Sequence, residues 1–214
     1  MDPERQLALA YVPAARRAAV EALWRLDVAL GSVLATGSDP MISRIRLAWW
    51  RESLEKLDQA RPLAEPVLEA VAEHVLAAGV KGGELAAMGE GWEALLSPGP
   101  LGSDMLDLYA RARGGRLFEY SARLLGHDAE EVAEGGEAWA LVDLARRVGS
   151  EVEIVAALAA ARTRTVRNRW PAPLRPIGML ATLALRDAVR GPKLARQGSP
   201  GRMARMLGHR FTGR

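Results

Sequence analysis

The sequence contains no cysteine among its 214 residues. This absence excludes a disulfide framework, a cysteine nucleophile and any metal site built on thiolates. Histidine is nearly as scarce, because His74, His127 and His209 are the only three and lie far apart in the chain. A metal site rich in histidine is therefore not expected either.

Long apolar runs are also missing. No uncharged apolar stretch approaches the roughly 18 residues that a membrane-spanning helix needs, and Met1–Arg5 lacks the apolar region of a secretory signal. Hydrophobic residues make up 49% of the chain and charged residues 26%, a balance typical of globular proteins. The length fits one domain over residues 1–214. We therefore expect a cytoplasmic single-domain protein.

Acidic residues are almost absent from the last quarter of the chain. Residues 161–214 hold 13 lysines and arginines but one acid, Asp187, whereas residues 1–160 hold 16 basic and 25 acidic residues. This asymmetry suggests an anionic partner, either external or the acidic part of the protein itself. Nucleic acid is an unlikely partner because no recognised binding module is present.

The basic tail, residues 192–214, is amphipathic at its end. Met203, Met206, Leu207 and Phe211 can share one helical face. Such a segment fits an acidic membrane surface, which would place the protein at the periphery of the inner membrane. It fits equally well a terminal helix that docks on the acidic body of the protein.

Helix formers dominate the composition, and runs of alternating β-branched and aromatic residues are missing. Apolar spacing and turn signals therefore predict an all-α helical bundle. The predicted helices cover about residues 14–34, 41–59, 66–78, 84–96, 104–125, 134–165, 175–189 and 200–208. One acid, Asp27, interrupts the apolar stripe of the first of these helices.

A glycine pair, Gly114 and Gly115, falls inside the helix predicted at 104–125. Each glycine costs roughly 1 kcal/mol of helix propensity. The pair indicates either a close approach of a neighbouring helix or a ligand, or a plain break between two shorter helices. The arginines of the surrounding segment, 111–116, can hold a phosphate or form a solvated basic face.

The most unusual segment is a tryptophan pair between arginines. Trp49 and Trp50 lie between Arg46 and Arg51 on the helix predicted at 41–59. One ring can pack inward while the other lies beside a guanidinium. The segment can line a site for an apolar, phosphorylated ligand, or it can anchor the core while its arginines face solvent.

Four segments in the correct order resemble the squalene/phytoene synthases, the all-α head-to-head prenyltransferases. They span about residues 8–190, and the Arg-Leu-Ala-Trp-Trp-Arg stretch is the most specific of them. The resembling segments are Ala22–Asp27, Arg46–Leu54, Tyr109–Gly115 followed by Leu124–Gly126, and Gly136–Arg146. The resemblance implies a single-domain bundle of the isoprenoid synthase type.

Members of this family condense two prenyl diphosphates. The resemblance implies two aspartate-rich motifs on facing helices, which hold the Mg²⁺ that activates the diphosphate leaving group. This chain departs from the family at both motifs. Residues 30–35, where the first motif belongs, contain no acid. The second motif begins with Arg147, and Glu151 occupies its i+4 place.

Three acids remain as weak candidates for a single Mg²⁺: Asp27, one turn before the first motif, Asp143, where the family usually has Asn, and Glu151. Two arginines, Arg146 and Arg147, fall where the metal cluster belongs, and guanidinium groups can pair with a diphosphate directly. We expect no cofactor if the protein is non-catalytic, and Mg²⁺ if it is catalytically active.

The resemblance therefore predicts a non-catalytic family member that binds an isoprenoid, another lipid or a protein partner. Asp39–Arg51 is similar to the branch of the family that includes a respiratory complex I assembly factor, so respiratory complex assembly is one such role. The alternative is an active, Mg²⁺-dependent prenyltransferase with degenerate motifs. If a prenyl diphosphate or lipid binds, the resemblance places Trp49, Trp50 and Leu141 in the pocket inside the bundle. Its anionic head then lies near four arginines, Arg46, Arg51, Arg146 and Arg147.

Overall fold

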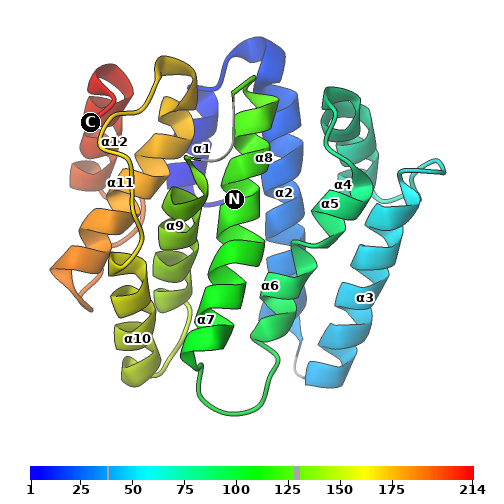
Figure 1. The fold of residues 1–214 in the computed structure, drawn as a ribbon, viewed down its shortest axis with the longest axis horizontal. Coiled ribbons are helices and arrows are strands. Elements are labelled where there is room, and N and C mark those ends of the chain that lie inside the picture. Colours follow the sequence, from blue (N-terminus) through cyan, green and yellow to red (C-terminus); the bar gives the residue numbers. More distant parts are fainter. Residues whose placement is uncertain (38, 128–130) are drawn as a thin grey trace.

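The chain folds into a bundle of helices that lie side by side (Figure 1). The computed structural model describes all residues except 38 and 128–130. No strand occurs in the part of the chain that it describes, which confirms the all-α prediction. No helix in that part is long and apolar enough to cross a membrane.

Most of the first half of the chain lies on the right-hand side of the bundle in Figure 1, whereas its first helix, α1, lies left of the centre. Its elements are α1 (Pro3–Ala10), α2 (Ala14–Thr36), α3 (Pro40–Lys56), α4 (Pro66–Ala70), the π-helical turn η1 (Val71–Val75), the 3₁₀ turn η2 (Leu76–Ala78), α5 (Gly82–Ala86) and α6 (Gly89–Ala94).

The second half begins with a continuous helical segment over residues 103–124, which we call the central rod, and it ends with the helix of the basic tail. Its elements are α7 (Ser103–Tyr109), the π-helical turn η3 (Ala110–Gly115), α8 (Arg116–Leu124), α9 (Ala133–Ala145), α10 (Glu151–Arg162), the 3₁₀ turn η4 (Ala172–Leu174), α11 (Arg175–Arg190) and α12 (Pro200–Thr212).

Two helices begin at an Asp-Pro pair. The Asp2 carboxylate accepts hydrogen bonds from the Glu4 and Arg5 amides at 3.0 Å and so caps α1. Asp39 accepts from the Met41 amide at 2.7 Å and caps α3. In both cases proline occupies the first turn, where its missing N–H costs nothing. Helix α1 is not among the helices predicted from the sequence, although it carries this same signal.

The glycine pair inside the central rod marks a close approach between two helices. A Cβ added at Gly114 would overlap the Gly136 carbonyl oxygen of α9, and a Cβ at Gly136 would overlap the Gly114 carbonyl. Helix α9 therefore crosses η3 backbone against backbone. This confirms the reading of the pair as a neighbouring-helix contact, and α7, η3 and α8 follow one another without a break over residues 103–124.

Two predicted helices are each divided in two. The segment predicted as one helix at 134–165 consists of α9 and α10, separated at residues 146–150. The chain leaves α9 in a turn in which the Arg147 amide donates to the Leu144 carbonyl at 2.8 Å, and Gly149 and Ser150 then lead into α10. The helix predicted at 84–96 is likewise two short ones, α5 and α6.

The crossing at Gly114 predicts a large difference between two glycine substitutions. Gly114→Ala should lower the free energy of unfolding by about 1–3 kcal/mol, because the added methyl group forces α9 away from η3. Gly208→Ala in α12 is the matched control, since a Cβ there meets nothing within 4 Å. It should be neutral or stabilising by up to about 1 kcal/mol. Urea unfolding measures both, and equal values would contradict the proposed crossing.

Candidate functional site

A buried arginine occupies the centre of the bundle. Arg113 belongs to the π-helical turn η3 and is only 1% exposed. Its Nε donates to Oδ1 of Asp27 at 2.8 Å, and its Nη2 donates to Oδ2 of the same carboxylate at 3.1 Å. This two-pronged geometry is the strongest form of arginine–carboxylate pairing. It ties the central rod to α2.

The same guanidinium reaches a second buried carboxylate on the opposite helix. Its Nη1 forms an ion pair with Oδ2 of Asp143 on α9 at 2.8 Å and donates a hydrogen bond to the Tyr109 hydroxyl. Asp27 and Asp143 thus face each other across Arg113. All three side chains are buried, so the pairing is shielded from water.

Two further arginines also pair with these carboxylates. Arg5 of α1 donates to Oδ2 of Asp27 at 2.9 Å. Arg147 donates through Nε and Nη2 to the two oxygens of Asp143, both at 3.0 Å. We refer to Arg5, Asp27, Arg113, Asp143 and Arg147 as the central ion network. Each of its four carboxylate oxygens accepts from, or is ion-paired to, a guanidinium nitrogen.

Aromatic rings enclose the buried guanidinium. The Arg113 Cζ atom lies 4.2 Å from the ring centroid of Trp92, 4.8 Å from that of Trp139 and 5.4 Å from that of Tyr109. Arg5 also lies over Trp139, at 4.5 Å. Such cation–π contacts stabilise a desolvated guanidinium. The aromatic faces therefore offset part of the solvation energy that the Arg113 guanidinium loses on burial.

The network holds both carboxylates in the ionised form. Burial opposes ionisation of Asp27, but the charges of Arg113 and Arg5 outweigh it, so the pKa of Asp27 lies below its usual value. The pKa of Asp143 is lowered in the same way, against burial, by Arg113, Arg5 and the hydrogen bonds from Arg147. Burial raises the pKa of Tyr109, so its hydroxyl stays protonated.

The donor set of the network does not suit a divalent metal ion. Mg²⁺ requires carboxylate oxygens that point at a shared, open position, whereas the oxygens of Asp27 and Asp143 are engaged by positively charged groups. The third candidate, Glu151, is exposed at the first turn of α10. Within the residues that the structure describes, no group of three or more histidine, aspartate or glutamate side chains could hold a metal ion.

A second buried ion network attaches the basic tail to the body. Arg202 of α12 donates to both oxygens of Glu4 on α1, at 2.6 and 3.0 Å, and to Oδ1 of Asp187 on α11 at 2.7 Å. Arg146 donates to Oδ2 of Asp187 at 2.6 Å and to the Ala195 carbonyl at 2.9 Å. Helix α12 is therefore docked on the bundle through opposite charges.

The apolar residues of the tail do not share one face. Met206 is buried, but Phe211 is 74% exposed. The sequence-based placement of Phe211 on this face is therefore wrong, whereas Met203 and Met206 both pack against the core. The buried face of α12 instead carries Arg202, Met206 and His209, because the charge pairing of Arg202 with Glu4 and Asp187 fixes the rotation of the helix.

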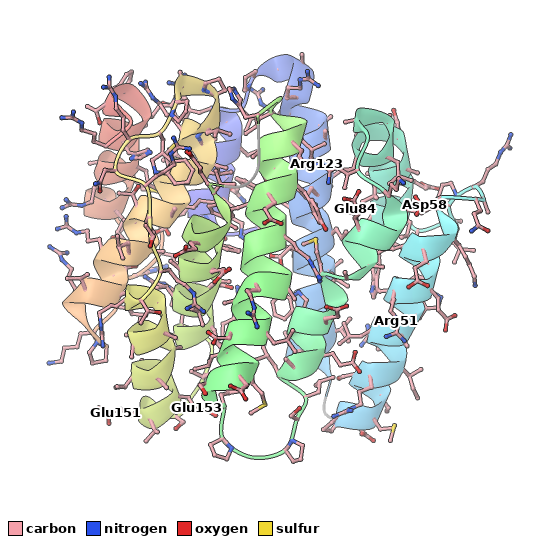
Figure 2. All side chains as sticks on the ribbon, viewed as in Figure 1. Arg51, Asp58, Glu84, Arg123, Glu151 and Glu153 are labelled. Carbon is pink, nitrogen blue, oxygen red and sulfur yellow. The ribbon has the colours of Figure 1, made fainter. Side chains whose placement is uncertain are left out.

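The residues predicted to hold a ligand lie in separate parts of the bundle and do not form one site. Arg46, Trp49 and Arg51 are exposed on α3, where Trp49 stacks edge to face on the buried Trp50 with ring centroids 5.2 Å apart. Arg46 lies 3.4 Å from the Thr36 hydroxyl. Figure 2 shows Arg51 at one side of the bundle and Glu151 at the other.

The remaining predicted residues belong to α9 or to its end. Leu141 is completely buried within α9. Arg146 and Arg147 pair with Asp187 and Asp143 respectively. The crevice between Asp143 and Arg146 has a volume of about 20 Å³, which is room for about one water molecule. The proposed binding roles of these seven residues stay predictions.

Sequence reasoning missed the two arginines at the heart of the site, Arg5 and Arg113. The interpretation of residues 111–116 as a solvated basic face is wrong for Arg113, which is buried against three aromatic rings. Two signals in the sequence pointed here. Asp27 interrupts an apolar stripe and so needs a buried partner, and the adjacent glycine pair brings α9 close to Arg113.

The burial of Arg113 predicts a strong asymmetry between two arginine substitutions. Arg113→Met should lower the free energy of unfolding by about 3–5 kcal/mol, because it leaves buried carboxylates without their shared cation. Arg147→Met should cost about 1 kcal/mol or less, since its side chain is 54% exposed and water screens the pair. Adding Asp27→Leu to Arg113→Met should recover part of the loss. A cost of 1 kcal/mol or less for Arg113→Met in urea unfolding would contradict the assignment.

The lowered pKa values predict acid sensitivity. Because the pKa of Asp27 and that of Asp143 are lower in the folded than in the unfolded chain, their stabilising contribution is complete above the unfolded values. It is lost progressively as the pH falls below about 5. Asp27→Asn should flatten this decline in a series of unfolding curves. Parallel curves for the variant and the natural protein would show that Asp27 titrates normally.

Comparison with known proteins gives one informative result. No curated protein and no solved structure matches the chain. The sequence model of the squalene/phytoene synthase family, by contrast, matches residues 1–165, which run from α1 to just beyond α10 and include the whole central ion network. The helical architecture agrees with the isoprenoid synthase fold. The chain belongs to the squalene/phytoene synthase family.

Proposed function

We propose that this protein is a non-catalytic member of the squalene/phytoene synthase family. The observation that carries the proposal is the position of Arg113. It places a fixed positive charge between Asp27 and Asp143, the two acids that face each other across the bundle. A side-chain cation there neutralises the carboxylates in the way that a metal ion would, but it offers no open coordination position for a diphosphate.

The surroundings of Arg113 support the same conclusion. Trp92, Tyr109 and Trp139 fill the space around the guanidinium, and the adjoining crevice of about 20 Å³ is too small for a prenyl chain. A prenyl chain bound beside Asp143 would have to displace buried aromatic rings. We therefore place the function of the protein at its surface and assign the central ion network a structural role.

The outer face of α3 is the surface that we propose for a protein partner. Met41, Ile42, Ile45 and Trp49 form an exposed apolar stripe along this edge helix. Their exposed fractions run from 42% to 63%, which is high for large apolar side chains near one another. Trp49 is held in place by its edge-to-face contact with Trp50, and a rigid exposed tryptophan is a frequent anchor of protein interfaces.

Charge defines the chemistry of this partner. Arg44, Arg46 and Arg51 flank the stripe and are exposed. None of them forms an ion pair with an acid in the described ranges of the chain. A complementary partner presents an apolar ridge bordered by acidic residues. A subunit or assembly intermediate of a larger complex, such as a respiratory complex, fits this role.

The test of the non-catalytic proposal combines activity with metal binding. The natural protein, incubated with farnesyl or geranylgeranyl diphosphate and Mg²⁺, should release no pyrophosphate. Its thermal unfolding midpoint should not rise with Mg²⁺ concentration. In Arg113→Ala, Asp27 and Asp143 lose their shared cation, so we expect a lower midpoint that rises again as Mg²⁺ is added.

One outcome would favour the alternative, an active prenyltransferase with degenerate motifs. Pyrophosphate release that requires Mg²⁺ and disappears in Asp143→Asn would show that the natural protein binds metal productively. Unfolding of Asp143→Asn has to be followed alongside, because a collapsed fold also abolishes activity. Loss of activity in Asp143→Asn is therefore informative only if the variant remains folded.

The proposed α3 surface is tested by a photo-crosslinking residue in place of Ile45. Because Ile45 is 63% exposed, its substitution should change the free energy of unfolding by less than about 0.5 kcal/mol. We expect crosslinking to one partner, within a segment that combines apolar and acidic residues, and we expect its loss in Arg46→Glu. Crosslinking to the same partner that persists unchanged in Arg46→Glu would contradict an interface that depends on the positive charge of α3.

A further inference from the structure

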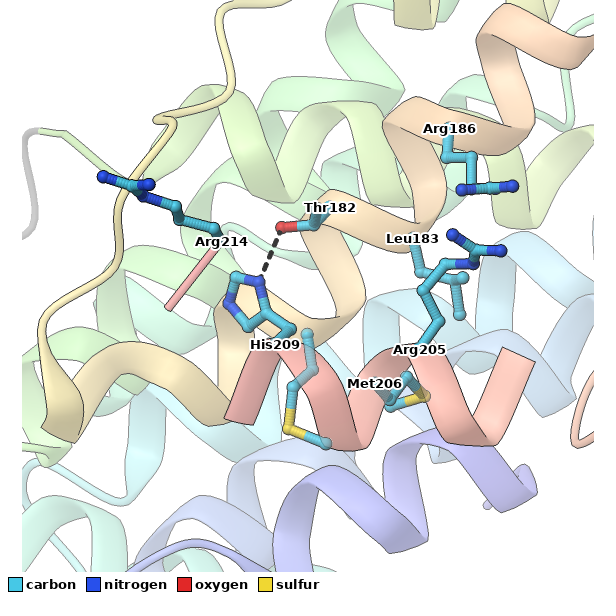
Figure 3. A pocket seen from close by; sticks show the side chains of 8 residues that line it. Thr182, Leu183, Arg186, Arg205, Met206, His209 and Arg214 are labelled. Atoms are coloured by element: carbon cyan, nitrogen blue, oxygen red, sulfur yellow. Dashed lines mark hydrogen bonds between the residues drawn. The ribbon is translucent and has the colours of Figure 1, made fainter. Parts of the chain in front are cut away.

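A separate crevice lies between α11 and α12, outside the central ion network. It has a volume of about 220 Å³. Figure 3 shows its walls, with Arg186 of α11 and Arg205 of α12 reaching toward each other on one side. Met179, Leu183 and Met206 supply the apolar lining. The crevice thus joins a positive rim to an apolar floor.

Arg186 and Arg205 give this rim a positive charge. Neither Arg186 nor Arg205 forms an ion pair with an acid among the described residues. The one acid of the last quarter of the chain, Asp187, is engaged by Arg146 and Arg202, although its charge still acts on the neighbouring Arg186. Arg214 also lines the crevice, and Arg190 adds a further charge one helical turn beyond Arg186 on α11.

Arg186 carries the clearest sign of an unfilled interaction. Its Nε is buried and has no hydrogen-bond acceptor within the described part of the chain. Desolvation, followed by the charges of Arg190 and Arg205, lowers the pKa of Arg186. Positive charges that lie close together without an acceptor repel one another and raise the electrostatic energy of the fold. Arg202 differs, because Glu4 and Asp187 neutralise its charge.

The size and lining of the crevice restrict the ligand. A volume of about 220 Å³ is below the ~300–1,000 Å³ typical of sites for drug-sized molecules, so the crevice accommodates a headgroup and a short part of a chain. Guanidinium pairs favour phosphate oxygens because each donor fork matches them. The methionine and leucine floor favours a ligand whose phosphate is attached to an apolar stem.

We propose that the α11–α12 crevice binds a phosphate ester that carries an apolar chain. Arg186 and Arg205 donate to the phosphate oxygens, and the first part of the chain lies against Met179, Leu183 and Met206. The ligand is either an acidic phospholipid within a bilayer or a free phosphorylated amphiphile. This site is independent of the proposed loss of catalysis, because none of its residues belongs to the central ion network.

The test measures binding of the full chain to two probes. Vesicles of phosphatidylcholine with phosphatidic acid represent the bilayer, and dihexanoyl phosphatidic acid below its micelle concentration represents the free amphiphile. Arg186→Gln and Arg205→Gln should each weaken binding of at least one probe by about tenfold or more. Arg196→Gln removes the same charge from an exposed position of the basic tail and should weaken vesicle binding by about fivefold or less, the effect of one surface charge.

The outcomes distinguish a phospholipid in a bilayer from a free phosphorylated amphiphile, and both from a general attraction between the basic protein and anionic lipid. Binding of both probes supports the site for either source, and binding of vesicles alone, with the same dependence on Arg186 and Arg205, assigns it to the membrane surface. Dihexanoyl phosphatidic acid should bind at least about tenfold more tightly than glycerol 3-phosphate if the apolar floor contributes. Equal losses in all three variants, or no binding of either probe, would overturn the proposal. Unchanged thermal midpoints verify that the variants fold.

Discussion

The charge balance around Arg113 is the constraint on which the rest of the bundle depends. One guanidinium joins α2, the central rod and α9, and it satisfies two carboxylates that burial would otherwise penalise. The close crossing at Gly114 and Gly136 brings α9 near enough for this contact. Three aromatic rings then seal the guanidinium from water. In a family whose interior holds a metal-dependent site, this interior is instead closed by side chains.

The sequence predicted the helical fold and most helix boundaries, and it offered a close approach at Gly114 as one of two interpretations, because apolar periodicity and glycine spacing are local signals. It also indicated that the acidic motifs were missing. It could not identify Arg113 as buried, since an arginine between two other charged residues of a helix looks solvated until α9 and Asp143 are placed beside it. The division of the helix predicted at 134–165 was also missed, because only a short turn at residues 146–150 separates α9 from α10.

Because aromatic side chains fill the space around Arg113, we look for binding surfaces on the outside of the bundle. The arginines of residues 161–214 divide into two groups with different roles. Arg202 is used internally, where Glu4 and Asp187 dock α12 on the bundle. Arg186 and Arg205 face a crevice without acids of their own. The strong positive excess of residues 161–214 therefore combines a structural part and an outward-facing part, and the apolar stripe of α3 provides a second outward surface at the opposite edge (Figure 1).

The central claim is that Arg113, and not a metal ion, neutralises Asp27 and Asp143. Crystals grown with Mn²⁺ and a non-hydrolysable prenyl diphosphate analogue test it most directly, because manganese is located by its anomalous scattering. The account predicts no anomalous peak within coordination distance of either carboxylate and an Arg113 guanidinium between them. A manganese peak bound to Asp27 or Asp143, with Arg113 displaced, would contradict it.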